Sequence, residues 1–360
     1  MPLEGDDISS IAAQYRDQLP MHEHMVTMDP PEHSKERALV MRLLTPIRLK
    51  DNEAFMWRLA DHQLDEFLPD GRCEFINAYA QPFALLAVAD VLGVPEEDHQ
   101  RFREGFGLSR RIGDVEAGAA GSPGENPLAW LDEWFAEYVE DRRRAPREDV
   151  LTKLALATYP DGSMPDVTSV VRTSTFLFAA GQETTARLLA GALRYLAEHP
   201  DVQAHLRANR DLIPNFLEEM LRTESPVKAD FRLAKRSSTI AGVDIKAGTP
   251  VMLLNGAANR DPARFECPAE VRLDRANAQS HMAFGRGVHS CPGGPLARVE
   301  GRVSLERILD RTRNVRLSEE HHGPPGAHHL DYEPSWMLRG LTRLHLEFDA
   351  VDAPPREVVR

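Results

Sequence analysis

The sequence has no long apolar run, few cysteines and no excess of positive charge. No segment approaches the roughly 18 to 20 consecutive apolar residues that cross a membrane, and no signal peptide opens the chain. Only three cysteines occur in 360 residues, which argues against a disulfide framework and fits a reducing compartment. The net charge of −13 argues against nucleic acid or an anionic membrane as a general partner. We therefore expect a cytoplasmic protein without a membrane span.

The chain is long enough, and with 42% hydrophobic residues apolar enough, to bury a large core. Its length alone would suggest two domains, but no break in composition separates them. We expect one domain over residues 1–360, with a poorly patterned start over 1–28 and a terminal tail over 350–360. Helical periodicity in much of the chain, followed by short strand patterns, favours a mainly α fold with a small β region. A hairpin is expected between 239–243 and 251–254.

The segment from Phe284 to Arg298 is a glycine-spaced loop that leads into a helix. Its glycines can adopt positive φ or let the backbone approach a flat group, and Pro295 is tolerated in the first helical turn. Cys291 precedes that helix, whose unpaired N–H groups and dipole favour a thiolate, a soft metal ligand. A small buried hydrophobe is the alternative for any single cysteine. A zinc site would have only two ligands, His289 and Cys291, and a catalytic pair of the two would lack an oxyanion elbow.

A second segment, from Asp166 to His199, is predicted to form one helix of about 30 residues with Asp166 as its N-cap. The middle of this helix contains Gly181, Glu183 and two threonines, which are poor choices for helix strength. Glycine costs about 1 kcal/mol in a helix interior, and threonine hydroxyls can bond the carbonyl of the preceding turn. A notch of small residues that admits a neighbouring helix would explain this composition as well as a functional site would.

In each of two predicted helices, a pair of residues shares one helical face, and the spacing alone does not indicate a function. His33 and Arg37 are four residues apart, and Glu219 and Arg222 are three apart. An ordinary polar face, or a weak ion pair, explains either spacing. Near the end of the chain a group of histidines could form a metal clip, although a solvated loop accounts for it better. These histidines are His321, His322, His328 and His329.

The string Phe-Gly-x-Gly-x-His-x-Cys-x-Gly from Phe284 to Gly293, followed by Leu-Ala-Arg, resembles the haem-binding loop of the cytochrome P450 family. It matches at every fixed position, and the motif is highly specific. Two weaker motifs of that family are also present. One is Asp-Pro-Pro-x-His-x-x-x-Arg over residues 29–37, and the other is Ala-Gly-x-Glu-Thr-Thr over 180–185.

The resemblance covers the chain from about Asp29 to Phe348 and implies a cytochrome P450-like fold. Haem b (iron protoporphyrin IX) would lie between the long helix and the cysteine loop, with Cys291 as the axial thiolate of the iron. Family members have several dozen residues before the first motif, where this chain has 28. Either the start is truncated or misassigned, or this chain lacks part of the small sheet that those residues form in relatives; of these we expect truncation.

The resemblance also implies roles for individual residues. Those implied for haem binding are His33, Arg37, Ala180, Gly181, Arg232, Phe284, Gly285, His289, Cys291 and Gly293. Glu183 and Thr184 would be the catalytic acid–alcohol pair that assists proton delivery. The positions implied for substrate contact are Ala179, Lys228, Ala229 and Trp336. Glu219 and Arg222 would form a buried structural ion pair, and the sequence does not identify its third partner.

The function that the resemblance implies is O₂-dependent hydroxylation, or a related oxidation, of a small apolar or amphipathic molecule. Electrons would come from a separate ferredoxin and its NAD(P)H-dependent reductase, because no flavin or iron–sulfur segment is fused to the chain. Arg286, Arg298 and Arg302 would form a basic docking face for the acidic ferredoxin. Two alternatives stay open. One is a peroxide-driven peroxygenase, although such relatives usually lack the acid–alcohol pair, and the other is a haem-based binding or sensing protein without turnover.

Overall fold

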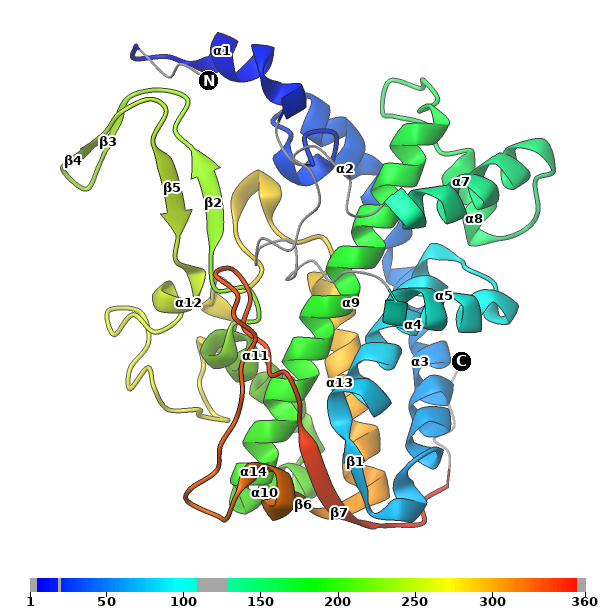
Figure 1. Ribbon diagram of the computed structural model, residues 1–360, viewed down its shortest axis with the longest axis vertical. Coiled ribbons are helices and arrows are strands. Elements are labelled where there is room, and N and C mark those ends of the chain that lie inside the picture. Colours follow the sequence, from blue (N-terminus) through cyan, green and yellow to red (C-terminus); the bar gives the residue numbers. More distant parts are fainter. Residues whose placement is uncertain (1–4, 19–20, 109–128, 355–360) are drawn as a thin grey trace.

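A computed structural model describes residues 5–18, 21–108 and 129–354 of the chain. Helices dominate it, and the predicted mainly α fold with a small β region is confirmed (Figure 1). The helices are α1 (Ser9–Gln14), α2 (Glu32–Leu43), α3 (Pro46–Asp65), α4 (Gln81–Leu92), α5 (His99–Leu108), α7 (Ala129–Arg144), α8 (Val150–Ala155), α9 (Val167–Glu198), α10 (Pro200–Ala208), α11 (Ile213–Glu224), α12 (Asn255–Ala258), α13 (Gly294–Arg311) and α14 (Glu319–His322). The strands are β1 (Arg72–Glu74), β2 (Asp230–Leu233), β3 (Ser238–Ile240), β4 (Val243–Ile245), β5 (Pro250–Leu253), β6 (Thr312–Leu317) and β7 (His345–Ala350).

Helix α9 runs through the middle of the molecule and organises the helices around it (Figure 1). The Asp166 carboxylate caps it as predicted, accepting a hydrogen bond from the Ser169 N–H at 2.6 Å. Most of its 32 residues are buried, and α4, α7, α11 and α13 pack against it. Gly181 lies against Val88 of α4, where an added Cβ would come within 2.8 Å of a valine methyl carbon. The close approach of α4 therefore requires this glycine, which favours the packing explanation for it.

The strands of the β region pair differently from the sequence prediction. In the described ranges they form a three-stranded sheet in the order β1-β7-β6 and two separate pairs, β2 with β5 and β3 with β4. The predicted hairpin between 239–243 and 251–254 is wrong, because β3 turns through Ala241 and Gly242 directly into β4. Both residues have positive φ, +49° and +81°, as a tight two-residue hairpin turn requires. Since this turn joins β3 and β4 into a hairpin of their own, β5 pairs with β2 instead.

The described parts of both chain ends lie against the body of the protein. Near the start, Ile8 is buried and its N–H donates to the Lys235 carbonyl at 2.8 Å. At the other end, the Ala353 carbonyl accepts a hydrogen bond of 3.2 Å from Arg307 of α13. The predicted tail is thus held as far as Ala353, and residues 355–360 lie outside the described ranges.

Candidate functional site

Cys291 lies in the loop before α13, on the wall of a surface recess of about 470 Å³. The loop turns through Gly285 and Gly287, whose φ angles of +62° and +76° other residues rarely adopt. The Cys291 N–H closes the loop with a hydrogen bond of 2.8 Å to the Phe284 carbonyl. Because the Cys291 side chain is exposed, its sulfur is accessible to a group from outside the chain.

The pKa of the Cys291 thiol is raised, which differs from the prediction based on the helix terminus alone. Desolvation by the surrounding protein is the largest cause, even though the side chain is exposed in its recess. The N–H groups of Gly293 and Gly294 and the charges of Arg37 and Arg298 act in the opposite direction. The helix terminus thus favours the thiolate as predicted but is outweighed. A bound metal cation would reverse this balance, since a coordinating thiol loses its proton.

Nitrogen donors from α2 and from the Cys291 loop converge in one cluster. His33 is 1% exposed, and its ring centroid lies 4.2 Å from that of His289. Burial lowers the pKa of both imidazoles, the charge of Arg37 lowers both further, and Arg232 adds to the effect on His289. The Nε2 atom of His33 is buried and has no hydrogen-bond partner within the described residues. A cluster of mutually repelling donors would be stabilised by carboxylates, so these residues fit the propionates of a haem.

The partly exposed residues in the middle of α9 include Phe176, Ala180 and Thr184, which share one helical face. The Thr184 hydroxyl donates to the Ala180 carbonyl at 2.9 Å, which leaves its oxygen able to accept a hydrogen bond. Glu183 is buried on a different side of the helix, where Arg187 Nη1 lies 3.0 Å from its Oε2. The acid and the alcohol are therefore neighbours in the sequence but face different surroundings.

The residues predicted to contact substrate fall into two groups. Ala179 and Ala229 are almost fully buried, with 1% and 0% of their surface exposed. Lys228 donates through Nζ to the Ser335 carbonyl at 2.9 Å, and the next residue, Trp336, is 75% exposed. The structure therefore brings Lys228 to the segment that carries Trp336.

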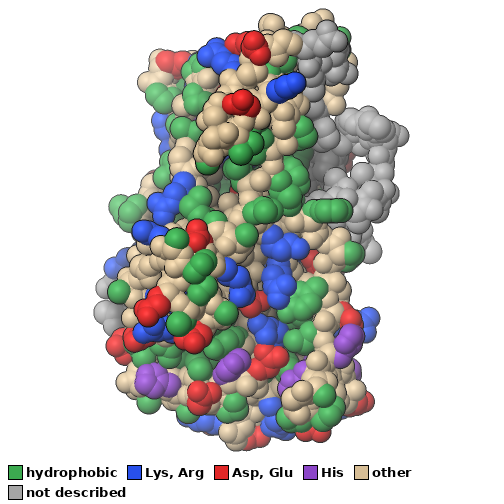
Figure 2. Space-filling view, turned by 90° about the vertical axis from the view of Figure 1, so that its left-hand side faces the viewer, with side chains coloured by type: hydrophobic (Ala, Val, Ile, Leu, Met, Phe, Trp, Pro, Cys, Tyr) green, Lys and Arg blue, Asp and Glu red, His purple; other side chains and the backbone are tan. Residues whose placement is uncertain are grey.

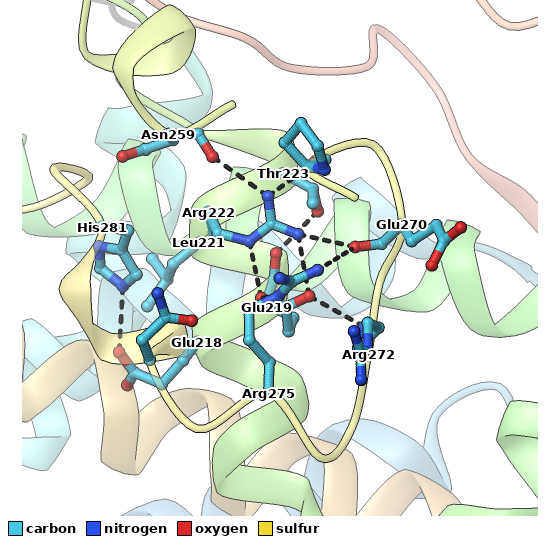
Figure 3. A network of polar contacts seen from close by, with 12 residues as sticks. Glu218, Glu219, Leu221, Arg222, Thr223, Asn259, Glu270, Arg272, Arg275 and His281 are labelled. Carbon is cyan, nitrogen blue, oxygen red and sulfur yellow. Dashed lines mark hydrogen bonds and ion pairs between the residues drawn. The ribbon is translucent and has the colours of Figure 1, made fainter. Parts of the chain in front are cut away.

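Glu219 and Arg222 of α11 form an ion pair whose side chains are both 0% exposed (Figure 3). Arg222 Nε and Nη2 lie 2.7 and 2.9 Å from the two carboxylate oxygens of Glu219. The third partner of this pair, which the sequence did not identify, is Arg275, whose Nε lies 3.0 Å from Glu219 Oε1. The Arg272 N–H also donates a hydrogen bond of 2.9 Å to Glu219 Oε2. Several arginines lie between residues 264 and 275, and their spacing gives no reason to select Arg275.

A second buried carboxylate, Glu218, connects α11 to the Cys291 loop and α13, and no pattern in the sequence had indicated it. It accepts hydrogen bonds of 3.0 Å from His281 Nε2 and from Arg298 Nη2. Burial alone would raise the pKa of Glu218, but these two partners outweigh burial and hold the pKa at about 2. Arg298 also lies over the Phe284 ring, 4.7 Å from its centroid. This network fixes the loop from the side of α11.

The arginines expected to form a docking face are largely engaged within the chain. Arg298 is bound by Glu218, and a guanidinium nitrogen of Arg302 lies 2.6 Å from a carboxylate oxygen of Glu53. Arg286 is exposed, and the hydrogen bonds described for it go to neutral groups. Of the three, Arg286 therefore retains the most unbalanced charge.

The histidines near the C-terminal end pack against one another and the backbone. His321 stacks on His345 with 3.8 Å between ring centroids, and His322 Nε2 accepts a hydrogen bond of 2.9 Å from the His345 N–H. On the face shown in Figure 2, the visible histidines lie toward the lower end. Throughout the described chain, no three His, Cys, Asp or Glu side chains are grouped as a metal site requires. The metal clip considered from the sequence is therefore not formed by these residues.

Within the described part of the chain, every helix is too short or too polar to act as a membrane span. A family model described as Cytochrome P450 matches residues 129–322. Among curated proteins, Cytochrome P450 144 of Mycobacterium tuberculosis is 36% identical over 324 residues, which cover 89% of this chain and 72% of that protein.

Solved structures are similar over nearly the whole chain. Mycobacterium marinum cytochrome P450 CYP150A6, in its substrate-free form, is 60% identical with a TM-score of 0.90. The match covers 98% of this chain and 82% of that one. CYP109E1 of Bacillus megaterium, solved in complex with testosterone, is 30% identical with a TM-score of 0.79, and 90% and 86% of the two chains are covered.

Proposed function

Because the chain belongs to the cytochrome P450 family of monooxygenases, we propose that it uses O₂ to oxidise a small apolar or amphipathic organic molecule. The observation that carries the proposal is the convergence of an accessible sulfur, Cys291, with the nitrogen donors His33, Arg37 and His289. These residues come from α2 and from the loop before α13, so only the folded chain brings them together. One thiolate ligand beside carboxylate-binding groups is one of the donor sets by which proteins hold a haem.

We propose that Cys291 holds the iron of haem b. His33, Arg37, Arg232 and His289 would bind the propionates. Burial is the largest cause that lowers the pKa of both imidazoles, and the positive charge of Arg37 lowers them further, so an anionic partner would offset that charge. When bound, the haem would supply O₂ activation and electron acceptance, chemistry that protein side chains lack. The chain itself would orient the haem and exclude water from its surroundings.

Glu183 and Thr184 are the proposed proton carriers. The Thr184 oxygen lies on the partly exposed face of α9 and can both accept and donate hydrogen bonds. Glu183 would take protons from water, which requires its carboxylate to give up its contact with Arg187. Burying a carboxylate or a hydroxyl in a helix interior costs free energy unless the group is hydrogen-bonded or paired, as both are here.

For electrons, we propose a ferredoxin with an NAD(P)H-dependent reductase. Arg286 would contribute most to meeting an acidic partner, since Arg298 and Arg302 are paired internally. For substrate, the testosterone in the Bacillus megaterium CYP109E1 structure is an amphipathic molecule of the class that we propose here. Lys228 and Trp336 would contact it.

The spectrum of the reduced protein with carbon monoxide tests the thiolate. The haem-loaded wild type should show the red-shifted absorption of thiolate ligation, and Cys291→Ser should lose it. Cys267→Ser removes another exposed cysteine and should keep the band. An unchanged spectrum in Cys291→Ser contradicts the proposal. With the band established, oxidation of substrate by peroxide but not by O₂ with ferredoxin and reductase would identify a peroxygenase instead.

A further inference from the structure

Among the residues that the structure describes, Lys228 has no acidic partner for its charge. Its half-buried side chain donates through Nζ to a neutral group, the Ser335 carbonyl, at 2.9 Å. The closest acid along the chain, Asp230, is bound instead by Asn255 Nδ2 at 2.6 Å. An ammonium group has three N–H donors, so two of those on Lys228 remain available to a group from outside the chain.

The backbone of Lys228 is fixed on both sides, which fixes where its ammonium group can reach. The Lys228 N–H donates to the Met337 carbonyl at 2.6 Å, and the Lys228 carbonyl accepts from the Gly256 N–H of α12 at 2.9 Å. The preceding residue, Val227, forms a β-bridge with Leu338. Lys228 is therefore held where the chain entering β2, the start of α12 and the segment before β7 meet. In Figure 1 that last segment runs between α9 and the β2–β5 pair.

Large apolar side chains are exposed on the same segments that hold Lys228. Trp336, which follows the carbonyl bonded by the lysine, is 75% exposed. Leu253 of β5 and Leu254, which precedes α12, are 41% and 55% exposed. Exposed apolar side chains that gather beside a charged group are typical of a binding surface rather than of an ordinary face. A fixed cation with apolar neighbours fits a ligand that has an anionic end and an apolar body.

We infer that the substrate is an amphipathic carboxylate and that Lys228 is the residue that selects it. The two available N–H donors match the two oxygens of one carboxylate, and the single charge balances it. A phosphate dianion would leave one charge unbalanced. The apolar body of the acid would lie against Trp336. This inference rests on the proposed function, which by itself requires only an apolar or amphipathic substrate.

The test compares dodecanoate with its methyl ester, which has the same apolar chain and no charge. Binding of each to the haem-loaded protein is measured by calorimetry, and a change in haem spin state shows that the probe lies beside the haem. Wild type should bind the acid at least about tenfold more tightly than the ester, because a charge-assisted bond is lost with the ester. Lys228→Met should weaken binding of the acid by about tenfold and leave the ester within about twofold.

Two further variants separate the charge of Lys228 from its contact with Ser335. Lys228→Arg keeps the charge and should keep the preference for the acid. Lys246→Met removes the charge of an exposed lysine on the turn between β4 and β5 and should change neither affinity. Equal weakening of acid and ester in Lys228→Met would show that the lysine only holds the segment that carries Trp336, and would overturn the inference. Equal affinity of wild type for the two probes, or no binding of dodecanoate, would overturn it as well.

The carbon monoxide spectrum separates this failure from failure of the proposed function. If the haem-loaded wild type lacks the red-shifted band of thiolate ligation, the proposed function fails and the inference fails with it. If the band is present and an uncharged molecule is oxidised with O₂ while the acid binds no better than the ester, only the selection of a carboxylate by Lys228 fails.

Discussion

Glu300 of α13 is a buried acid whose protonation makes stability depend on pH. The side chain lies in the core, 1% exposed, where its Oε2 accepts a hydrogen bond of 3.0 Å from the Thr185 hydroxyl. Its other oxygen is buried with no hydrogen-bond partner among the described residues. Burial raises the pKa of Glu300 to about 8, and the Thr185 bond opposes this only in part.

The sign of the effect follows from where the proton is held. Below about pH 4.5, the ordinary pKa, folded and unfolded chains both keep the Glu300 proton. Between about 4.5 and 8 the unfolded chain releases it while the folded chain keeps it, so the free energy of unfolding falls as pH rises. A span of about 3.5 pH units at about 1.4 kcal/mol per unit corresponds to a loss of roughly 5 kcal/mol from this group.

Glu300→Gln removes the titrating group while keeping the shape and an acceptor for Thr185. We expect the variant to lose roughly 4 kcal/mol less stability than wild type between pH 5 and 8, measured by urea unfolding with the same haem content. Glu97→Gln, at an exposed carboxylate, should retain the pH dependence of wild type. Equal slopes in Glu300→Gln and wild type would show that the buried acid does not keep its proton.

Two further substitutions test the packing around α11 and α13. Arg222→Ala should lower the free energy of unfolding by about 3–5 kcal/mol. The reason is that Glu219, whose side chain is 0% exposed, would lose its bidentate partner and keep only Arg275 and the Arg272 N–H. An unchanged Tm would contradict this prediction. Gly301→Ala should lower the free energy of unfolding, measured in urea, by about 1–3 kcal/mol, because the new Cβ would lie 2.8 Å from Leu217 Cδ2. An unchanged free energy of unfolding would mean that the Leu217 side chain rearranges freely.

The sequence predicted best the features that local forces determine. The bounds of α9 follow from a cap at Asp166 and a continuous helical pattern, and both signals lie within the helix itself. The loop around Cys291 is likewise a local structure, since its turns need positive φ at Gly285 and Gly287. The mainly α architecture follows from the same kind of information repeated along the chain.

Pairings between distant segments could not be predicted, because many candidate partners have the same chemistry. Arg275 pairs with Glu219 only because the chain after β5 folds back onto α11, whereas the side chain of the nearby Arg272 pairs with Glu266 and Asp274. The pairing of β5 with β2 depends on the β3–β4 hairpin that lies between them in the sequence. Glu333 reaches Arg187 from the far end of the chain, and nothing in either local sequence indicates the contact.

The thiol of Cys291 shows how a correct local argument can give the wrong net result. The N–H groups at the start of α13 and two arginines lower its pKa, as the helix terminus predicts. Desolvation by surrounding protein has the opposite sign and is larger. Burial depends on the whole fold, so the sequence could indicate the first effect but not the second.

Glu183 and Thr184 show the same limit in geometry. Successive helical residues point about 100° apart, so adjacent side chains face different surroundings. Thr184 lies on the partly exposed face, whereas Glu183 lines a cavity on another side of the helix, beside Arg187. For a proton on Glu183 to reach Thr184, the carboxyl must rotate or a water must bridge the two.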